Sequence, residues 1–244
     1  MKRFIVDPIR TVVTIVVALL ATGWASATVM VIGWMRPDSP MIDRVLRRWS
    51  RIWLAVGGVT LHIEGGEHVD PSRSYVVVSN HRSNFDIMVN FLAVDLPIRF
   101  LAKKELFALP LVGAAMRAIG MVEVDRHRGG LVHTQLNSDA GEAVAHARSL
   151  MVYPEGTRTR DGSMQEFKKG AFAIAVVAGL PILPVTIQGS YIAWPAKGLV
   201  RGGPIRVSIS KPIETEGMGR RDIVRLTKEV RQLILDDYNR LAST

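Results

Sequence analysis

The sequence predicts an α/β protein in which a mostly parallel or mixed sheet is flanked by helices and preceded by an N-terminal membrane-associated helical segment. Two patterns support this prediction. After residue 58, short apolar runs alternate with longer segments of helical periodicity, as in strands joined by crossover helices. Before them, residues 11–35 contain no Asp, Glu, Lys, Arg or His. We therefore divide the chain into a membrane-anchoring part, residues 1–57, and one domain that is large enough to be an enzyme, residues 58–244.

Composition excludes several classes of protein. Of the 244 residues, 48% are hydrophobic and 22% are charged, which is not the composition of a disordered chain. The absence of cysteine excludes a disulfide framework, a thiolate metal site and a cysteine nucleophile. A net charge of +9 favours an anionic partner, which could be a phosphorylated substrate, a membrane surface or nucleic acid.

The uncharged run at residues 11–35 would extend about 37 Å as a helix, which is enough to cross a bilayer. Two other interpretations stay open. A cleaved secretory signal would end at Ala25-Ser26-Ala27, although apolar residues continue beyond that point. A bent helical pair that enters only one leaflet would turn at Gly23, Gly33 or Pro37.

Residues 41–56 have an amphipathic helical pattern, with Trp49 and Trp53 on the apolar face and arginines on the opposite face. This pattern fits a helix in the headgroup plane and equally a helix packed on the globular core. More basic residues follow the apolar run than precede it, so the positive-inside rule places the main domain in the cytoplasm. The basic residues that follow it are Arg36, Arg44, Arg47, Arg48 and Arg51.

The main domain contains the strands and helices of the predicted sheet. We expect strands at 59–63, 75–79, 98–102, 121–124, 150–153, 182–187 and 205–209. We expect helices at 85–94, 106–119, 131–147, 170–178 and 220–241. Ligand sites in such sheets form outside the carboxyl ends of the strands, so polar residues that follow a strand are the candidates for function.

The first candidate site is Asn-His-Arg-Ser-Asn-Phe-Asp at residues 80–86, between an expected strand and an expected helix. Residues five apart on a continuous helix point about 140° away from each other, so His81 and Asp86 can meet only where the backbone turns. A strand-to-helix corner supplies such a turn. Asp86 would fix the tautomer of His81, whose other ring nitrogen could then take a proton from an attacking hydroxyl as a general base.

Two simpler interpretations compete with a catalytic dyad. The His-x4-Asp spacing by itself also arises by chance. In addition, Ser83 and Asp86 form a Ser-x-x-Asp pattern close to a capping box, in which Asp86 would only stabilise the start of the helix.

The second candidate site is Tyr-Pro-Glu-Gly-Thr-Arg-Thr-Arg at residues 153–160, which again directly follows an expected strand. Gly156 would let backbone N–H groups approach an anion, Thr157 adds a hydroxyl, and Arg158 offers a planar set of donors suited to phosphate. Alone, the stretch equally fits an ordinary charged loop that ends in an Asp-Gly turn.

Together with two further stretches, these blocks resemble the ordered motifs of the glycerolipid acyltransferase family, typified by lysophosphatidic acid acyltransferases. Residues 80–86 resemble its Asn-His-x-Ser-x-x-Asp motif. Residues 153–160 are similar to its aromatic-Pro-Glu-Gly-Thr-Arg-Ser-Arg motif, with Tyr153 in place of the commoner Phe and Thr159 in place of the commoner Ser.

The remaining blocks carry the resemblance over residues 75 to about 190. Residues 120–126 resemble the family's glycine-led strand that ends in arginine, although Glu123 stands where an aromatic or aliphatic residue is more usual. The apolar strand around a proline is similar to residues 180–185, and residues 102–106 resemble the family's Ala-Lys-Lys-Glu-Leu.

This resemblance implies acyl transfer from a thioester of coenzyme A or acyl carrier protein to a free hydroxyl of lysophosphatidic acid. His81 would be the base and Asp86 would orient it, without an acyl-enzyme, since the chain has neither cysteine nor a Gly-x-Ser-x-Gly elbow. Glu155 would position Arg158 or a backbone turn. The residues expected to bind the acceptor phosphate are Arg158, Gly156, Thr157, Arg126 and Lys103.

Other functions stay open at this point. The acceptor could instead be glycerol 3-phosphate or another lysophospholipid, and a catalytically silent membrane lipid-binding protein could keep the same fold. Nucleic acid is not expected, because no recognition motif is present and the basic residues cluster beside the apolar N-terminal segment. We expect no cofactor and no metal, since no His or carboxylate cluster has ligand spacing. Backbone N–H groups near residues 81–86 or 156–158 are the expected oxyanion donors.

Overall fold

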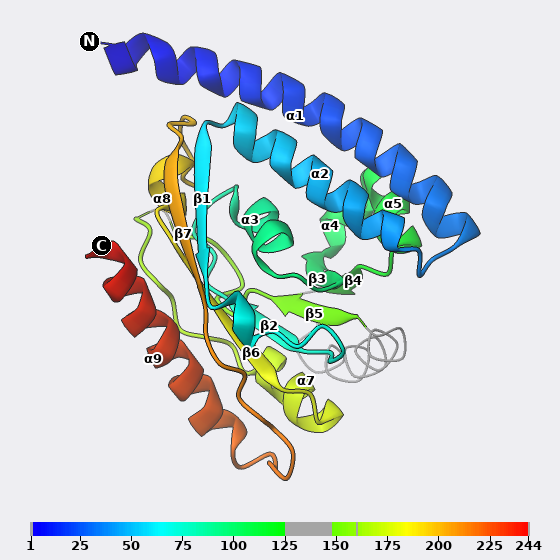
Figure 1. The fold of residues 1–244 in the computed structure, drawn as a ribbon, viewed down its shortest axis with the longest axis vertical. Helices are drawn as coiled ribbons and strands as arrows, with labels where there is room; N and C mark the ends of the chain where they lie inside the picture. Colours follow the sequence, from blue (N-terminus) through cyan, green and yellow to red (C-terminus); the bar gives the residue numbers. More distant parts are fainter. Residues whose placement is uncertain (1, 125–147, 160, 244) are drawn as a thin grey trace.

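The computed structural model describes residues 2–124, 148–159 and 161–243 (Figure 1). Its centre is a seven-stranded sheet in the order β1-β7-β6-β2-β5-β3-β4. Neighbouring strands are parallel except for β6 and β7, so the sheet is mixed, as predicted. The strands are β1 (Val59–Glu64), β2 (Val76–Ser79), β3 (Ile98–Lys103), β4 (Val122–Val124), β5 (Ser149–Val152), β6 (Ile182–Gln188) and β7 (Gly203–Ile209).

Helices cover both faces of this sheet (Figure 1). Side chains alternate along β2: Val77 packs in the core on the side of α2 and α3, whereas Val76 and Val78 pack on the side of α7 and α9. Burial on both faces explains why the central strands are continuous apolar runs in the sequence. The helices of the main domain are α3 (Asp86–Ala93), α4 (Lys104–Phe107), α5 (Val112–Ala118), α7 (Gly170–Ala178), α8 (Ser190–Ala193) and α9 (Ile223–Ala242), with a 3₁₀ turn at Gly66–His68.

Every expected strand is present, but one expected helix is wrong. The segment 106–119 forms two short helices, α4 and α5, instead of one. The break has a local cause, because Pro110 cannot donate a helical hydrogen bond and Leu111 adopts a φ of 63°. Neither the 3₁₀ turn nor α8 was expected from the sequence, and the expected helix at 131–147 lies outside the described residues.

The N-terminal segment is a helical hairpin, made of α1 (Lys2–Met35) and α2 (Pro40–Val56). Helix α1 runs through Gly23 and Gly33 without interruption, so the chain turns only afterwards, in the segment that contains Pro37. A Cβ at Gly33 would lie 2.6 Å from the carbonyl oxygen of Ala118, because α1 passes very close to α5 there. Residues Val6–Met35 are long and apolar enough to cross a membrane.

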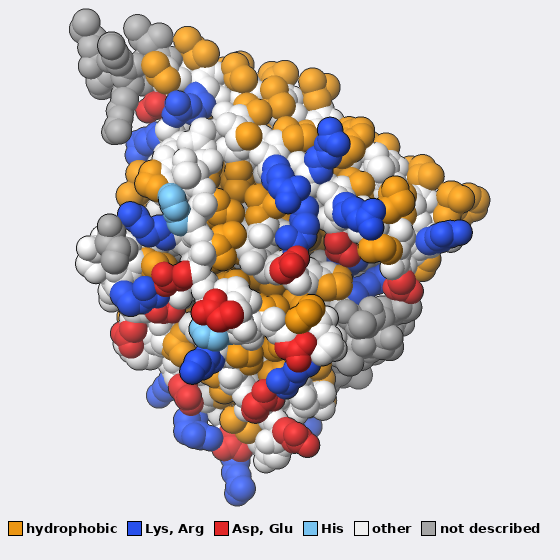
Figure 2. Space-filling model, in the orientation of Figure 1, with side chains coloured by type: hydrophobic (Ala, Val, Ile, Leu, Met, Phe, Trp, Pro, Cys, Tyr) orange, Lys and Arg blue, Asp and Glu red, His pale blue; other side chains and the backbone are white. Residues whose placement is uncertain are grey.

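Most of α1 is covered on one side only. The side chains of Leu19 and Leu20 are exposed, and Trp34 is 87% exposed, while Ala18, Ala25 and Val29 are buried. Figure 2 shows the exposed apolar side chains as a strip along this helix, beside basic side chains over α2. The outer face of α1 is therefore a long apolar surface on the described part of the molecule.

Helix α2 joins the hairpin to the main core. Ser39 caps it by accepting a hydrogen bond from the Met41 N–H at 3.3 Å, and Ile42, Leu46 and Leu54 are buried against α3 and the sheet. Of the two interpretations of its amphipathic pattern, packing on the core is the observed one for the apolar face. Its arginines Arg44, Arg48 and Arg51 are exposed.

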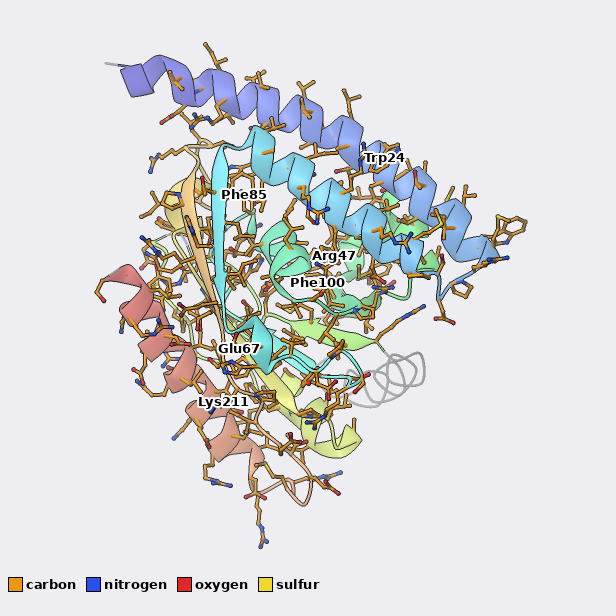
Figure 3. All side chains as sticks on the ribbon, in the orientation of Figure 1. Trp24, Arg47, Glu67, Phe85, Phe100 and Lys211 are labelled. Atoms are coloured by element: carbon orange, nitrogen blue, oxygen red, sulfur yellow. The ribbon has the colours of Figure 1, made fainter. Side chains whose placement is uncertain are left out.

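The end of α2 abuts the first candidate site. A Cβ at Gly57 would lie 2.3 Å from the ring of Phe85, and Figure 3 shows Phe85 beside the junction of α2 and β1. Trp53 of α2 stacks on Trp194 with ring centroids 5.9 Å apart, and Trp194 meets Phe85 edge-on at 5.0 Å. The hairpin therefore packs directly on residues of the loop that follows β2.

Candidate active site

The two sequence motifs follow neighbouring parallel strands. His81 comes after β2 and Glu155 after β5, and Val78 of β2 is paired with Val152 of β5. Because the carboxyl ends of parallel strands meet at one edge of a sheet, both loops lie at the same edge. Lys103 ends β3, the next strand on the far side of β5.

His81 and Asp86 form a hydrogen-bonded pair at the strand-to-helix corner. Nδ1 of His81 lies 2.9 Å from Oδ2 of Asp86, which is completely buried, whereas the His81 side chain is 16% exposed. A carboxylate oxygen can only accept, so Nδ1 carries the proton and Nε2 is left with its lone pair. This arrangement is suited to general-base chemistry at Nε2.

Asp86 also shapes the loop, so the capping interpretation describes part of its role. Its Oδ2 accepts hydrogen bonds from the N–H groups of Arg82 and Ser83, each at 2.7 Å. In turn, Oγ of Ser83 accepts a hydrogen bond from the Phe85 N–H at 3.1 Å, directly before α3 begins. The same carboxylate therefore orients the imidazole and closes the turn that presents it.

Tyr153 supports the imidazole from one side, which sequence reasoning missed. The two rings stack with centroids 4.0 Å apart and an angle of 13° between their planes. The Tyr153 hydroxyl accepts a hydrogen bond of 2.9 Å from Nδ2 of Asn90, a completely buried residue of α3. Asn90 lies four residues after Asp86 and so on the same helix face, which was the one available signal. Burial, together with the charge of Asp86, raises the pKa of Tyr153 well above its usual value and keeps the phenol neutral.

Glu155 joins the two loops. Its Oε1 accepts a hydrogen bond of 2.7 Å from the His81 N–H, and its Oε2 accepts one of 2.9 Å from the Gln165 N–H. Of the two roles expected for Glu155, it therefore fulfils the second, positioning backbone rather than Arg158. Burial raises the pKa of this carboxyl, although its two backbone hydrogen bonds oppose the shift.

Arg158 is oriented by a neutral side chain. Its Nη1 donates a hydrogen bond to Oδ1 of Asn84, and Nδ2 of Asn84 donates to the carbonyl oxygen of Pro195 at 3.0 Å. Gly156 adopts a φ of 77°, which favours glycine, and Thr157 is exposed on the same turn. This turn thus places a guanidinium beside the loop that carries His81.

The remaining expected residues are less closely tied to this centre. Lys103 is exposed at the same sheet edge and, within the described residues, makes no side-chain hydrogen bond or ion pair with His81 or Arg158. Arg126 lies outside the described residues. No group of three His, Asp or Glu side chains suited to a metal ion occurs in the ranges 2–124, 148–159 and 161–243.

The backbone N–H groups of residues 81–85, one of the two sets expected as oxyanion donors, already have acceptors within the protein. The N–H of His81 is bound to Glu155, and those of Arg82 and Ser83 are bound to Asp86. The N–H groups of the next two residues donate to the Trp194 carbonyl at 3.3 Å and to Oγ of Ser83. These groups stabilise the loop itself, and in the second loop the Gly156 N–H likewise donates within the protein, to the Tyr153 carbonyl at 3.0 Å.

Comparison with known proteins identifies the family. A family model described as "Acyltransferase" matches residues 60–188, which include both loops. The chain belongs to the acyltransferase family. Its sequence is 34% identical over 188 residues to the human 1-acyl-sn-glycerol-3-phosphate acyltransferase alpha. It is 33% identical over 191 residues to the 1-acyl-sn-glycerol-3-phosphate acyltransferase of Pseudomonas aeruginosa.

The extent of these matches differs between relatives. The match with the human acyltransferase covers 76% of this chain but 66% of that protein, just under two thirds of its length. For the bacterial relative the values are 75% and 72%. The fold of this acyltransferase-family chain matches the crystal structure of the 1-acyl-sn-glycerophosphate (LPA) acyltransferase from Thermotoga maritima with a TM-score of 0.84 and 25% identity, over 99% of this chain and 98% of that one.

Proposed function

We propose that the protein is a 1-acyl-sn-glycerol-3-phosphate acyltransferase, which acylates the free hydroxyl of lysophosphatidic acid to give phosphatidic acid in phospholipid synthesis. The donor is an acyl thioester of coenzyme A or of acyl carrier protein. The observation that carries this proposal is the His81 imidazole, whose Nδ1 is bound 2.9 Å from a buried carboxylate and whose Nε2 is left to accept a proton. The names of the relatives support the same reaction.

The proposed reaction is a direct displacement at the thioester carbonyl. Nε2 of His81 takes the proton from the acceptor hydroxyl while its oxygen bonds to the carbonyl carbon, and Asp86 stabilises the resulting imidazolium. The tetrahedral intermediate collapses as the carbon–sulfur bond breaks. The imidazolium returns its proton to the leaving sulfur, so the products are an ester and a thiol.

The second loop would hold the acceptor. Arg158 projects from the turn beside the His81 loop and can bind a phosphate with two parallel hydrogen bonds. Thr157 and Gly156 lie on the same turn and would add a hydroxyl and a close backbone approach. A bound phosphate would hold the glycerol hydroxyl near Nε2 of His81. The hydroxyl would then attack from a fixed position instead of in a random encounter.

The hairpin of α1 and α2 would attach the enzyme to a membrane, with the main domain on the cytoplasmic side. The apolar strip along α1 lies beside the exposed arginines of α2, which is the combination that binds an anionic lipid surface (Figure 2). The lipid substrate and product then stay close to the bilayer that holds them.

A direct assay tests this function. The purified full-length protein in detergent is mixed with labelled acyl-coenzyme A, or acyl carrier protein loaded with the same label, and with lysophosphatidic acid. We expect labelled phosphatidic acid from wild-type protein and none above background from His81→Ala. If product forms only with glycerol 3-phosphate or only with lysophosphatidylcholine, that compound and not lysophosphatidic acid is the acceptor. Binding of lysophosphatidic acid without any product would establish a silent lipid-binding protein instead.

A further inference from the structure

Arg158 has a neutral partner, unlike several arginines elsewhere in the fold. Arg47, Arg99 and Arg148 are each paired with a carboxylate, at 2.7 to 2.8 Å. Arg158 instead donates to the amide oxygen of Asn84, and it forms no ion pair with any residue in the described ranges. A neutral acceptor orients the guanidinium, and no carboxylate of the described residues forms an ion pair with it.

The Asn84 amide has only one useful orientation. Its Nδ2 donates to the Pro195 carbonyl at 3.0 Å, so its Oδ1 must face Arg158. The Trp194 carbonyl, one residue before Pro195, accepts hydrogen bonds from Oγ of Ser83 at 2.7 Å and from the Asn84 N–H at 3.3 Å. Asn84 is therefore held by the segment at residues 194–195 and can hold Arg158 in turn.

A second cation lies over the same turn. The ammonium nitrogen of Lys168 would be 2.9 Å from a Cβ at Gly156, and the Lys168 N–H donates to the Pro154 carbonyl, also at 2.9 Å. Two carboxylates of the neighbouring segments are engaged elsewhere. Glu155 accepts the two backbone N–H groups described above, and Glu166 pairs with Arg231 at 3.1 Å. Lys168 thus adds a positive charge that no carboxylate of the described residues neutralises.

We propose that, at the phosphate site assigned above to Arg158, Asn84 positions the guanidinium without neutralising it and Lys168 supplies a second positive charge. This inference rests on the proposed function and names the chemical group by which the site would recognise its substrate, a phosphate monoester. A phosphate monoester carries close to two negative charges at neutral pH, whereas a phosphodiester carries one. Two cations that no carboxylate of the described ranges neutralises favour the monoester. Lysophosphatidic acid and the 3′-phosphate of coenzyme A share this chemistry.

The first test introduces a charge at residue 84, and it also removes the amide donor to the Pro195 carbonyl. Asn84→Asp retains the shape of the side chain but turns the contact with Arg158 into an ion pair that competes with the phosphate. We expect about a tenfold weaker binding of a short-chain lysophosphatidic acid, measured by titration calorimetry, and about a threefold loss in Asn84→Ala. Binding of the phosphate-free monoacylglycerol should change by less than twofold in both variants.

A double-mutant cycle tests whether Asn84 acts through Arg158. If it does, adding Asn84→Ala to Arg158→Ala should not weaken the binding of lysophosphatidic acid any further. Equal losses for monoacylglycerol and lysophosphatidic acid would mean that Asn84 has only a structural role, and would overturn the proposal. So would Asn84→Asp binding as tightly as the wild type.

The second test uses the neighbouring lysine as a control. Lys168 and Lys169 are adjacent and both exposed, but only Lys168 lies over Gly156. Lys168→Gln should weaken phosphate binding about threefold, Lys168→Arg should restore it, and Lys169→Gln should leave it unchanged. Equal behaviour of the two glutamine variants would remove Lys168 from the site.

Parallel titrations identify the source of the phosphate. If Lys168→Gln weakens the binding of lysophosphatidic acid, the site binds the acceptor. If it weakens the binding of coenzyme A but not that of dephospho-coenzyme A, the site binds the donor. These titrations need no turnover. A protein that binds phosphate through these residues yet transfers no acyl group would refute the proposed function and leave the phosphate site intact.

Discussion

The loops that follow β2 and β5 lie at the same edge of the sheet but differ in how deeply they are buried. In the first loop, each backbone N–H from His81 to Phe85 donates to an acceptor within the protein. Buried Arg82 also lies over the ring of Tyr238 in α9, at 4.0 Å from its centroid. In the second loop Pro154 and Glu155 are buried and the half-buried Tyr153 stacks on His81, whereas the turn that follows is exposed or half-buried.

This difference indicates a division of labour. The proposed base, His81, and its carboxylate are held by contacts within the protein, which would avoid reorganisation during proton transfer. The inner part of the second loop serves the same purpose, because Tyr153 stacks on the imidazole and Glu155 holds its backbone. The outer part carries cations with little internal compensation. Substitutions in the inner group should therefore lower kcat, and substitutions in the outer group should raise KM or Kd.

Of the variants that test this comparison, His81→Ala should have the largest effect on kcat. Loss of the general base should lower kcat by about 10³-fold, while binding of lysophosphatidic acid stays within about twofold. Single-turnover acyl transfer and calorimetric binding measure the two quantities separately. If purified His81→Ala retains substantial turnover, the first loop does not contain the base.

Asp86→Asn should have the next largest effect. We expect kcat to fall by about 10²-fold, because an amide cannot hold the same tautomer and stabilise an imidazolium. Since Oδ2 accepts two backbone N–H groups as well, the free energy of unfolding should also fall, by about 1–3 kcal/mol. Urea unfolding and kinetics on the same sample distinguish the two roles. A loss of stability with normal kcat in the folded fraction would leave Asp86 with the capping role alone.

Glu155→Gln should lower kcat about tenfold, because glutamine has one acceptor oxygen for two backbone donors. It should also change how stability depends on pH. Burial raises the pKa of Glu155, so the native protein binds this proton more tightly than the unfolded chain does. Wild-type stability therefore loses one favourable contribution as the pH rises from the usual carboxyl range through the raised pKa.

That pH dependence can be isolated by subtraction. The free energy of unfolding of wild type minus that of Glu155→Gln should decrease as the pH rises through the mildly acidic range, as measured by urea unfolding at several pH values. A difference that increases with pH would mean that the two hydrogen bonds outweigh burial and that the pKa is lowered.

The smallest expected effect concerns Tyr153. Tyr153→Phe keeps the ring over His81 and loses only the hydrogen bond from Asn90, so kcat should change by less than about threefold and stability by about 1 kcal/mol. Tyr153→Leu removes the stack and should lower kcat more than Tyr153→Phe does. Equal kcat values for the two variants would show that the stack does not position the imidazole.

Local patterns were sufficient to predict the strands and the His81–Asp86 contact. Strands of the central sheet are short apolar runs, and a strand-to-helix corner is a local event that the spacing of His81 and Asp86 requires. The break at Pro110 and Leu111 was missed because apolar periodicity alone was followed through a proline. That proline was a signal available in the sequence.

Long-range contacts were not predictable in this way. Asn84 meets Pro195, 111 positions away, and its amide orientation depends on that meeting. The contact between Lys168 and Gly156 requires the chain to fold back after the second loop, and the stack of Tyr153 on His81 depends on the pairing of β5 with β2. Contacts between side chains of different strands can be predicted only once the order of the strands in the sheet is known.

The close approach of Gly57 to Phe85 has a practical consequence for any shortened form of this protein. Removing residues 1–57 to improve solubility would strip the cover from the Phe85 ring, which is completely buried, and would take away the indole that stacks on Trp194. The loop that carries His81 would lose the packing that α2 provides on one side. Fragments without the hairpin are thus poor substitutes for the intact protein, even in assays with water-soluble substrates where no bilayer is needed.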